Sequence, residues 1–476
     1  MFAEKFTLGL LSCLMLYPSH PKSQAVEVWL TQANQEKLFS HETPIPLFNG
    51  ETKKAVEIVV DTMTRYQQIE GFGAALTGSS AYVINRHLHS EARAKLLKEL
   101  FDHENGIGLS YLRLSIGSSD FSLGLYSYDD VPIGKTDFEL EHFSIAQERT
   151  DLIPVLKEIY SVNPQISLMA SPWSAPAWMK DSQKMEGGRL RKKAFPAYAK
   201  YFTKYIQEFA AEGIPINAIT IQNEPQHEAL YPSMAMSADE QSEFIANHLG
   251  PLFAQAQIKT QILLFDHNWD SPQYPISILD NPQAKKYVTG SAFHCYEGEV
   301  SAMSKVQEAH PEMGLYFTEC SSGLWYADFA ENFLDVSKLL VTTTNNWSKN
   351  VLMWNLALDE KYGPTTNPAD SNGGNGCMEC LGLIAIHSQT GQVTRNADYY
   401  AFAHFAKFVR PGAYRVASTQ LADKEILNVA FVNSDGTRVL VVFNNSNMEK
   451  TFTIKESGKS FLYSLPPQAM ATLNWE

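Results

Sequence analysis

The stretch AITIQNEP, which runs from Ala218 to Pro225, carries a short apolar run directly into a carboxylate. An apolar run of this length is typical of a strand that is buried on both faces. Asn223 and Glu224 then place polar groups, one of them charged, where the strand should stop. Because a buried charge is costly without partners, the Glu224 carboxylate must be solvated, paired or used in chemistry.

The same pattern recurs along the middle of the chain. Short apolar runs predict strands at residues 68–73, 109–116, 166–171, 216–222, 261–266, 291–294, 315–318 and 351–355. Helical patterns lie between most of them. Eight strands alternating with helices favour an α/β fold of the TIM (β/α)8 type. The alternative is an open doubly wound sheet, for which Gly71-Phe72-Gly73 is too weak a dinucleotide signal.

Three of the intervening helices carry recognisable ends. The segment 90–101 repeats leucine at helical spacing, and Ser90 is in a suitable place for an N-terminal cap. The segment that begins at Phe195 ends at Gly213, a residue that suits a C-terminal cap. A further helix is expected to start at Ser237.

Both ends of the chain have strand patterns rather than helical ones. The segments 26–30 and 56–60 are apolar or alternating, and two β-rich runs flank the turn Asn433 to Gly436. We therefore expect residues 26–70 and 409–476 to form one β-sandwich side domain, with residues 71–408 forming the barrel.

The first residues are typical of a signal peptide, which we assign to residues 1–25. Lys5 precedes an apolar stretch that is too short to span a bilayer, and Ser23-Gln24-Ala25 has the small residues of a cleavage site. We expect no integral membrane segment after its removal and a secreted or periplasmic protein. A net charge of −14 argues against nucleic acid as a partner. The sequence carries no indication of the oligomeric state.

The remaining four cysteines do not predict a metal site. Cys377 and Cys380 form a single Cys-x-x-Cys pair, with no second pair at zinc-site spacing. In an exported protein, disulfides or free thiols are the better interpretation for these two residues and for Cys295 and Cys320, and the pairing stays open. We expect neither a metal nor a cofactor.

Polar or aromatic residues follow six of the predicted strands. Enzymes with a barrel of this kind build their sites at the carboxyl ends of the strands. Two carboxylates that converge there from different strands, Glu224 and Glu319, are the equipment of glycoside hydrolysis, in which one protonates the leaving oxygen and the other attacks the anomeric carbon. The residues at the other four strand ends are Asp120, Trp173, Tyr296, Trp354 and Asn355. We also expect Pro225 to keep Glu224 in an extended conformation.

Seven motifs in this order resemble glycoside hydrolase family 30, which contains glucosylceramidases and β-glucanases. They are GFGAALTGSSA, SSDFS, ASPWSAPAWMK, QNEP, FHCYEG, FTEC and MWNLALD. The resemblance covers nearly the whole mature chain. It implies a TIM barrel with a β-sandwich built from both termini, and hydrolysis with retention of configuration.

The resemblance also implies roles for individual residues. Glu224 matches the acid/base and Glu319 the nucleophile of the family. The residues that match positions lining the glucose subsite are Asp120, Trp173, Asn223 and Trp354. Positions behind or beside the catalytic groups are matched by Arg113, His294 and Tyr296.

The leading hypothesis is a retaining β-glycosidase of the glucosylceramidase type, and the alternative is an endo-β-1,6-glucanase of the same family. Cys295 stands where glucosylceramidases often have tryptophan, and the Gly-Cys-x-x-Cys loop at 376–380 is closer to the glucanase branch. A lipid substrate needs an apolar entrance, for which Phe121, Leu125, Trp325 and Tyr326 are candidates. The alternative from another class is a carbohydrate-binding protein without catalytic activity.

Overall fold

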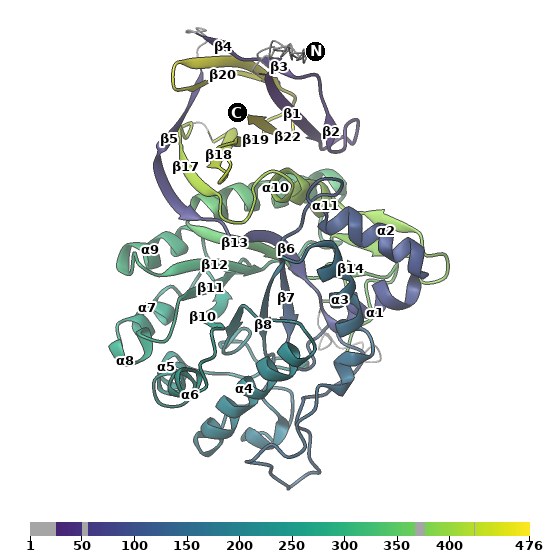
Figure 1. The fold of residues 1–476 in the computed structure, drawn as a ribbon, viewed down its shortest axis with the longest axis vertical. Helices are drawn as coiled ribbons and strands as arrows, with labels where there is room; N and C mark the ends of the chain where they lie inside the picture. The colour runs from purple at the N-terminus through teal and green to yellow at the C-terminus, as the bar shows by residue number, and fades with distance from the viewer. Residues whose placement is uncertain (1–24, 50–55, 367–376, 423) are drawn as a thin grey trace, which may run out of the picture.

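The computed structural model describes residues 25–49, 56–366, 377–422 and 424–476. Figure 1 shows a strand barrel with its helices below a second layer of strands that contains both ends of the described chain. The expected signal peptide lies outside the described residues except for Ala25, where the first strand begins. Most of the segment 367–380, which carries the glucanase-like loop, also lies outside them.

Within the described residues, eight parallel strands close into a barrel, which confirms the predicted fold class. Strand β9 pairs with both β8 and β10, so the sheet has no free edge. In chain order the barrel strands are β6 (Gly71–Ala75), β7 (Tyr111–Ser115), β8 (Ser167–Ser171), β9 (Ala218–Thr220), β10 (Gln261–Asn268), β11 (Gly290–His294), β12 (Gly314–Glu319) and β13 (Ser348–Met353).

Helices cover the outside of the barrel (Figure 1). Helix α2 begins one residue earlier than predicted, because the ring of His89, rather than the Ser90 hydroxyl, accepts from the backbone N–H of the first turn, that of Ala92. The predicted start at Ser237 is confirmed by a capping box with Glu240. The helices are α1 (Gly78–His87), α2 (Ser90–Phe101), α3 (Leu152–Val162), α4 (Phe195–Ala211), α5 (Ala238–Phe244), α6 (Gly250–Gln255), α7 (Gln273–Leu279), α8 (Pro282–Lys285), α9 (Ser301–Ala309), α10 (Phe329–Asn345) and α11 (Ala397–Ala406).

The inside of the barrel below the strand ends is a packed core. Inward-facing residues of seven strands form one buried cluster, so the barrel has a solid floor under its mouth. Its members are Tyr111, Met169, Ala218, Leu263, Ala292, Tyr316 and Leu352.

The second layer combines strands from both ends of the described chain. Strand β1 (Ala25–Gln32) pairs with β22 (Ala469–Trp475), and β5 (Glu57–Gln68) lies between β17 (Tyr414–Ser418) and β20 (Lys450–Glu456). The predicted hairpin is present: β18 (Ile426–Val432) pairs with β19 (Arg438–Asn444), and Gly436 has a φ of +87° in the turn. A separate apolar core fills this layer, as in a sandwich.

The shorter strands complete two sheets. Strand β21 (Lys459–Leu465) pairs with β20 and with β4 (Phe48–Asn49), whereas β2 (Ser40–His41) and β3 (Ile45–Pro46) pair with β1. Strands β14 (Ala357–Leu358), β15 (Ile384–Ile386) and β16 (Val393–Arg395) form a small sheet beside the barrel.

A buried histidine joins the two layers. His404 lies in α11 and is fully buried, and its two ring nitrogens are each 2.9 Å from a threonine hydroxyl of the sandwich, Thr31 in β1 and Thr472 in β22. Burial lowers the pKa of His404 to about 3, so the ring is neutral at pH 7. The contact fixes the sandwich on the barrel through hydrogen bonds that no water can replace.

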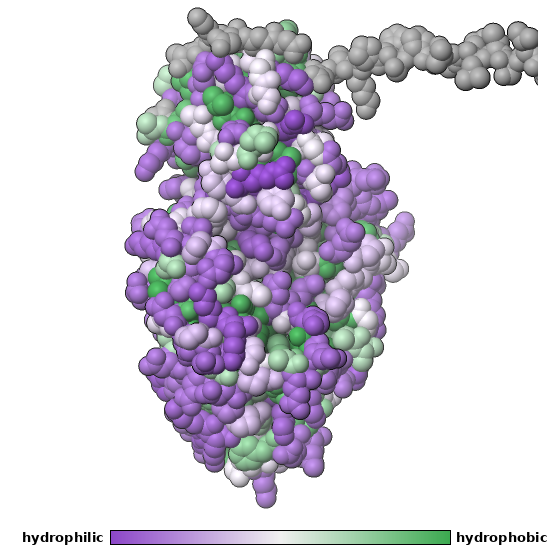
Figure 2. Space-filling view, turned by 60° about the vertical axis from the view of Figure 1, so that its left-hand side comes forward, coloured by the Kyte–Doolittle hydropathy of each residue, from purple (hydrophilic) through white to green (hydrophobic). Residues whose placement is uncertain are grey.

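The face shown in Figure 2 is ordinary for a folded protein. On the face shown in Figure 2 hydrophilic residues dominate, and apolar ones lie in small separate groups. Of the helices in the described residues, none combines the length and apolar character that crossing a bilayer requires.

We predict that His404→Gln lowers the free energy of unfolding by about 1–3 kcal/mol at pH 7, because the buried hydroxyls of Thr31 and Thr472 each lose one of their two hydrogen-bond partners. Urea unfolding followed by tryptophan fluorescence measures the loss. Thr472→Val should destabilise to a similar degree from the other side of the contact, and the two effects should not add.

The effect of His404→Gln should also shrink in acid. Between its folded pKa of about 3 and its ordinary value of 6.5, His404 binds a proton only in the unfolded chain, so the wild type loses stability as the pH falls. Glutamine does not titrate. The difference in unfolding free energy between wild type and His404→Gln should therefore decrease by about 2 kcal/mol between pH 7 and pH 5. A difference that does not change with pH would contradict the neutral state of His404 in the folded protein.

Candidate active site

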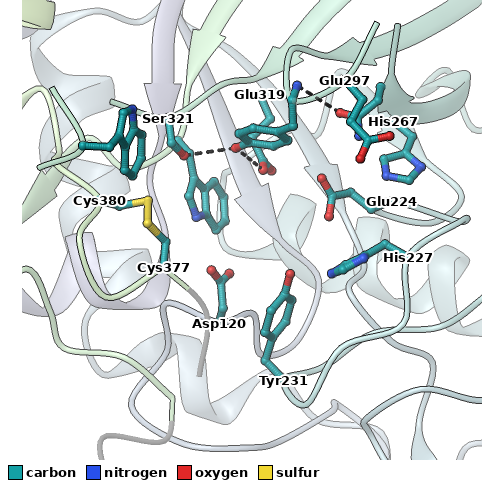
Figure 3. Close-up of a pocket in the computed structure, with 14 residues that line it drawn as sticks. Asp120, Glu224, His227, Tyr231, His267, Glu297, Glu319, Ser321, Cys377 and Cys380 are labelled. Atoms are coloured by element: carbon teal, nitrogen blue, oxygen red, sulfur yellow. Dashed lines mark hydrogen bonds between the residues drawn. A yellow bond between two sulfur atoms is a disulfide. The ribbon is translucent and has the colours of Figure 1, made fainter. Parts of the chain in front are cut away.

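The side chains that the sequence singles out come together at the carboxyl ends of the barrel strands. A cavity of about 410 Å3 opens there, lined by Asp120, Glu224, Tyr296, Glu319 and Trp354 (Figure 3). The other four predicted residues are buried and contact residues of this lining or one another: Arg113, Trp173, Asn223 and His294.

The two predicted carboxylates face each other across this cavity. Glu224 follows β9 and Glu319 ends β12, and both point into the same space in Figure 3. An oxygen of each, together with a ring nitrogen of His294, lies within 4.8 Å of the other two. A separation of about 5 Å leaves no room for a water between the carboxylate and the reacting carbon, and suits direct attack on that carbon.

Asp266, two residues before the end of β10, is the buried centre of the site, and no sequence motif pointed to it. Its two oxygens accept from Arg113 Nη2 at 2.8 Å and approach His294 Nε2 at 3.0 Å. Three hydroxyls, from β8, β9 and β12, also donate to it. They belong to Ser171, Thr220 and Thr318.

The partners of Asp266 hold the two carboxylates that face the cavity. Arg113 donates through Nη1 to Glu319 and through Nη2 to Asn223 Oδ1 at 2.7 Å. His294 Nδ1 lies 3.0 Å from Glu224 Oε1. One buried carboxylate therefore orients both cationic side chains, and each of these positions one of the two glutamates.

A local distortion of β10 brings Asp266 to this position. Phe265 and Asp266 have φ values of +70° and +67°, and the pairing of β10 with β11 changes register between Phe265 and His267. Such a bulge redirects a side chain that regular alternation would place elsewhere. The Asp266 carbonyl also accepts from the Glu224 N–H at 3.0 Å, so the bulge holds the backbone of Glu224 as well.

Glu224 itself is not extended, so the expectation drawn from Pro225 is wrong. Its φ is +48°, in the left-handed region that residues other than glycine rarely adopt. Backbone hydrogen bonds on both sides hold it there: Asn223 N–H donates to Pro172 at 2.8 Å, and the Glu224 carbonyl accepts from His227 at 2.9 Å. Tertiary hydrogen bonds have overridden the local preference before proline.

The charges of the site differ from those of free side chains. Burial lowers the pKa of His294, but Glu319, Asp266 and Glu224 raise it to about 9, so the ring is an imidazolium. This cation outweighs burial at Glu224 and holds its pKa below the ordinary value, whereas burial raises the pKa of Glu319.

Asp120 is the third carboxyl group of the cavity. Burial and the charges of Glu319 and Glu224 raise the pKa of Asp120 to about 8, so it is mostly protonated at pH 7. Its Oδ1 is buried and has no hydrogen-bond partner among the described residues. An unsatisfied carboxyl group at the bottom of a polar cavity is suited to bind a hydroxyl group.

Two tryptophans form the wall beside Asp120. The rings of Trp173 and Trp354 stack with centroids 4.8 Å apart, and the Arg113 guanidinium lies 4.8 Å from the Trp173 ring. Phe121 is fully buried against Trp354, so this candidate for an apolar entrance is a core residue. Leu125 and Trp325 are about half exposed.

Further residues that the sequence did not point to complete the cavity. His227, Tyr231 and His267 line it near Glu224, and Glu297 lies at its edge (Figure 3). Burial lowers the pKa of His267 to about 4, so this ring is neutral beside Glu224. His227, Tyr231 and Glu297 lie in loops and His267 lies in β10, so only the fold reveals that the four are neighbours.

The four cysteines form two disulfides, Cys295–Cys320 and Cys377–Cys380. The first joins the ends of β11 and β12, and the second borders the cavity (Figure 3). The donors closest to a metal-binding arrangement in the described residues are Glu224, His294 and Glu319, but both nitrogens of His294 are engaged by carboxylates as an imidazolium. This donor set does not suit a metal, which needs a neutral imidazole.

The chain matches two family models that together span nearly all of the described residues. Residues 69–409 match the glycosyl hydrolase family 30 TIM-barrel domain, and residues 412–473 match the family 30 beta sandwich domain.

Individual proteins agree with this match. The chain is 34% identical over 445 residues to an endo-1,6-beta-D-glucanase of Neurospora crassa, covering 88% of each protein. It is 29% identical over 432 residues to the lysosomal acid glucosylceramidase of Mus musculus, covering 85% of this chain and 80% of the relative. Among solved structures, the endo-beta1,6-glucanase BT3312 superposes with a TM-score of 0.86 at 33% identity, covering 94% of this chain and 99% of that one.

The paired carboxylates at the barrel mouth, the two matched domains and the relatives over most of the chain lead to one assignment: the protein is a glycoside hydrolase and belongs to glycosyl hydrolase family 30.

Proposed function

We propose that the protein hydrolyses β-glucosyl linkages with retention of configuration, with Glu319 as the nucleophile and Glu224 as the general acid and base. The observation that carries the proposal is the approach of the two carboxylates to within 4.8 Å, each held by a different cation of one buried network. This spacing is that of retaining rather than inverting glycosidases.

In the first step a Glu319 oxygen attacks the anomeric carbon while Glu224 transfers its proton to the leaving glycosidic oxygen. The carbon–oxygen bond to the leaving group breaks and a glycosyl ester of Glu319 forms. In the second step Glu224 takes a proton from water, and the resulting hydroxide displaces Glu319. Each step inverts the anomeric centre, so the product has the configuration of the substrate.

The reaction requires a proton on Glu224 and a charge on Glu319, the reverse of the preference in the ligand-free site. The two arrangements differ only in which glutamate carries the proton, and the two carboxylate oxygens lie within 4.8 Å of each other. A bound glucoside places the carbon that becomes positive beside Glu319 and the oxygen that becomes negative beside Glu224. The developing positive charge favours ionised Glu319 and the developing negative charge favours protonated Glu224. Binding of substrate therefore shifts the proton from Glu319 to Glu224.

For the glucose unit that is cleaved, the cavity offers groups of the right chemistry. Protonated Asp120 has an unpaired oxygen for a sugar hydroxyl, and the Trp354 ring can stack against a sugar face. Among the described residues the Asn223 amide nitrogen donates to no partner, whereas its Oδ1 accepts from Arg113. It can donate to the 2-hydroxyl, a contact that strengthens in the transition state.

Of the two substrate classes, a β-1,6-linked glucan has the stronger support. Three endo-1,6-beta-glucanases are 34%, 34% and 30% identical to the chain, whereas a putative glucosylceramidase of Caenorhabditis elegans is 30% and the mouse glucosylceramidase 29% identical. The edge of the cavity carries His227, Asn268 and Glu297, which can bind the hydroxyls of a second sugar. Glucosylceramide is the second candidate, favoured by half-exposed Trp325, which lines the cavity, and by the half-exposed Leu324 and Met378 beside the lining residues Trp325 and Cys377 in the chain.

The substrate prediction is tested with a linear β-1,6-glucan and with glucosylceramide in detergent micelles. We expect kcat/KM for the glucan to be at least about tenfold higher, because a site built for hydroxyls discriminates against a ligand that leaves them unpaired. A β-1,3-glucan serves as the linkage control. A higher value for glucosylceramide would reverse the order of the two candidates.

Glu319→Gly should abolish hydrolysis of an aryl β-glucoside, because no nucleophile remains on the α face of the sugar. Sodium azide should restore turnover and yield the α-glucosyl azide, since the small anion occupies the space of the missing carboxylate. Glu224→Ala should instead yield the β-azide, because azide then attacks the glycosyl ester from the opposite face. NMR of the products identifies the anomers. A β-azide from Glu319→Gly and an α-azide from Glu224→Ala would mean that the two glutamates have the opposite roles.

Glu224→Gln should lower kcat/KM by about 10²–10⁴-fold for a glucoside with a poor leaving group. The basic limb of its pH profile should disappear, because glutamine has no proton to lose. The acidic limb should move to lower pH, since the charge on Glu224 that raises the pKa of Glu319 is gone. Initial rates between pH 3 and pH 9 measure both limbs. A profile equal to that of the wild type would show that Glu224 is not the general acid.

A further inference from the structure

The Cys295–Cys320 disulfide lies at the chain neighbours of the catalytic groups. Cys295 stands between His294 and Tyr296, and Cys320 directly follows Glu319. Across the two strands, His294 is the register partner of Glu319, after a register shift at Phe293. The disulfide therefore joins the next residue of each strand, at a Cα separation of 5.4 Å, where the pairing of β11 with β12 ends.

The residues on either side of Cys295 contact the two carboxylates. His294 Nδ1 lies 3.0 Å from Glu224 Oε1, and the Tyr296 hydroxyl donates to Glu319 Oε1 at 2.9 Å. On the other strand the Cys320 carbonyl accepts from the Trp354 N–H at 2.7 Å, which connects the disulfide to the wall of the sugar cavity. The cross-link thus fixes three segments of the site relative to one another.

Tyr296 depends on this cross-link more than His294 does. His294 is fully buried and is held by Asp266, whereas Tyr296 lies beyond the end of β11 and is 43% exposed. Its backbone N–H donates to Asn268 Oδ1 at 3.1 Å, and its hydroxyl also contacts Ser321 at 3.0 Å. Beyond His294 and Glu319 the two strands no longer pair. Without the covalent link, no strand pairing would therefore fix the distance from Tyr296 to Glu319.

We propose that the Cys295–Cys320 disulfide is a positioning element of the active site, which holds Tyr296 against Glu319, and that its reduction lowers kcat. The proposal rests on the hydrolytic function proposed above. The two cysteines act through their chain neighbours and do not touch the substrate.

A second cavity makes the disulfide accessible. This cavity, of about 460 Å3, adjoins the catalytic one, with which it shares Tyr296, Ser321 and Trp325, and both cysteines line it. Cys295 is only partly buried. A small dithiol can therefore reach the sulfur atoms without unfolding the barrel.

Reduction by a dithiol proceeds by thiol–disulfide exchange. A thiolate of the reagent attacks Sγ of one cysteine, the S–S bond breaks, and the other cysteine leaves as a thiolate that takes up a proton. The second thiol of the reagent then displaces the first cysteine, so the dithiol becomes a cyclic disulfide and both cysteines become thiols. Two electrons pass from the reagent to the protein.

A purely structural disulfide and a positioning one give different kinetics. In either case the folded protein loses stability when the bond is removed. Only a positioning role changes the rate of the folded enzyme, because a displacement of about 1 Å costs up to about a hundredfold in rate. For Cys295→Ser/Cys320→Ser we expect kcat on an aryl β-glucoside to fall between about tenfold and about a hundredfold, with KM changed less than about twofold.

The pH profile supplies a second readout. Loss of the Tyr296 hydrogen bond removes a donor that favours ionised Glu319, so the pKa of Glu319 rises and the acidic limb of kcat/KM moves to higher pH. A fall in stability alone does not move this limb. The charged and titratable groups that face Glu319 are Arg113, Asp120, Glu224, His294 and Tyr296, and both variants below retain all of them.

The second disulfide provides a matched control. Cys377→Ser/Cys380→Ser keeps only the Cys295–Cys320 bond, so its kcat should still fall on addition of a dithiol and recover on removal of the reagent. Cys295→Ser/Cys320→Ser keeps only Cys377–Cys380, and its kcat should not respond. Circular dichroism at the assay temperature confirms that each sample is folded, and titration of free thiols with mass mapping identifies the bond that was reduced.

Two outcomes would overturn the proposal. One is a double serine variant with normal kcat and pH profile and only a lower melting temperature. The other is an unchanged kcat for wild-type protein that is folded and has Cys295 and Cys320 reduced. This measurement does not depend on whether a variant folds. If the oxidised wild type hydrolyses no β-glucoside, the proposed function fails instead; if Glu319→Gly responds to azide as predicted, only the positioning role is in question.

Discussion

The buried interaction between Asp266 and its two cations, Arg113 and His294, is the constraint on which the rest of the site depends. Charges can be buried only when they are paired and hydrogen-bonded. Arg113 and Asp266 have fully buried side chains and meet at 2.8 Å. Since each cation continues to one of the facing glutamates, the requirement to satisfy Asp266 also sets where Glu224 and Glu319 stand.

This arrangement explains why two like charges can lie so close together. Isolated carboxylates at this distance would repel each other until one took up a proton. Here the Arg113 guanidinium contacts Glu319 and the His294 imidazolium contacts Glu224, and these positive charges offset the repulsion between the two carboxylates. This arrangement suits the proposed reaction, in which Glu224 acts first as an acid and then as a base.

The fold was largely predictable from the sequence, and parts of the site were predictable for the same reason. Apolar runs that end on polar residues predicted both the barrel strands and the positions of Glu224 and Glu319. Asp266 has the same signal, at the end of the apolar run from Gln261, but alternation along a strand does not reveal a bulge. The positive φ of Glu224 was predicted wrongly, because hydrogen bonds to Pro172, Asp266 and His227 decide it rather than its neighbour Pro225.

The sequence by itself determined the periodic elements, the hairpin at Gly436, the capping box at Ser237 and the set of strand-end residues that carry the chemistry, because these depend on neighbours a few residues apart. Only the tertiary structure decided the pairing of Cys295 with Cys320, the burial of Phe121, the junction at His404 and the central place of Asp266. Each of these depends on which strand ends become neighbours in space, and closure of the barrel brings together side chains that lie many residues apart along the chain.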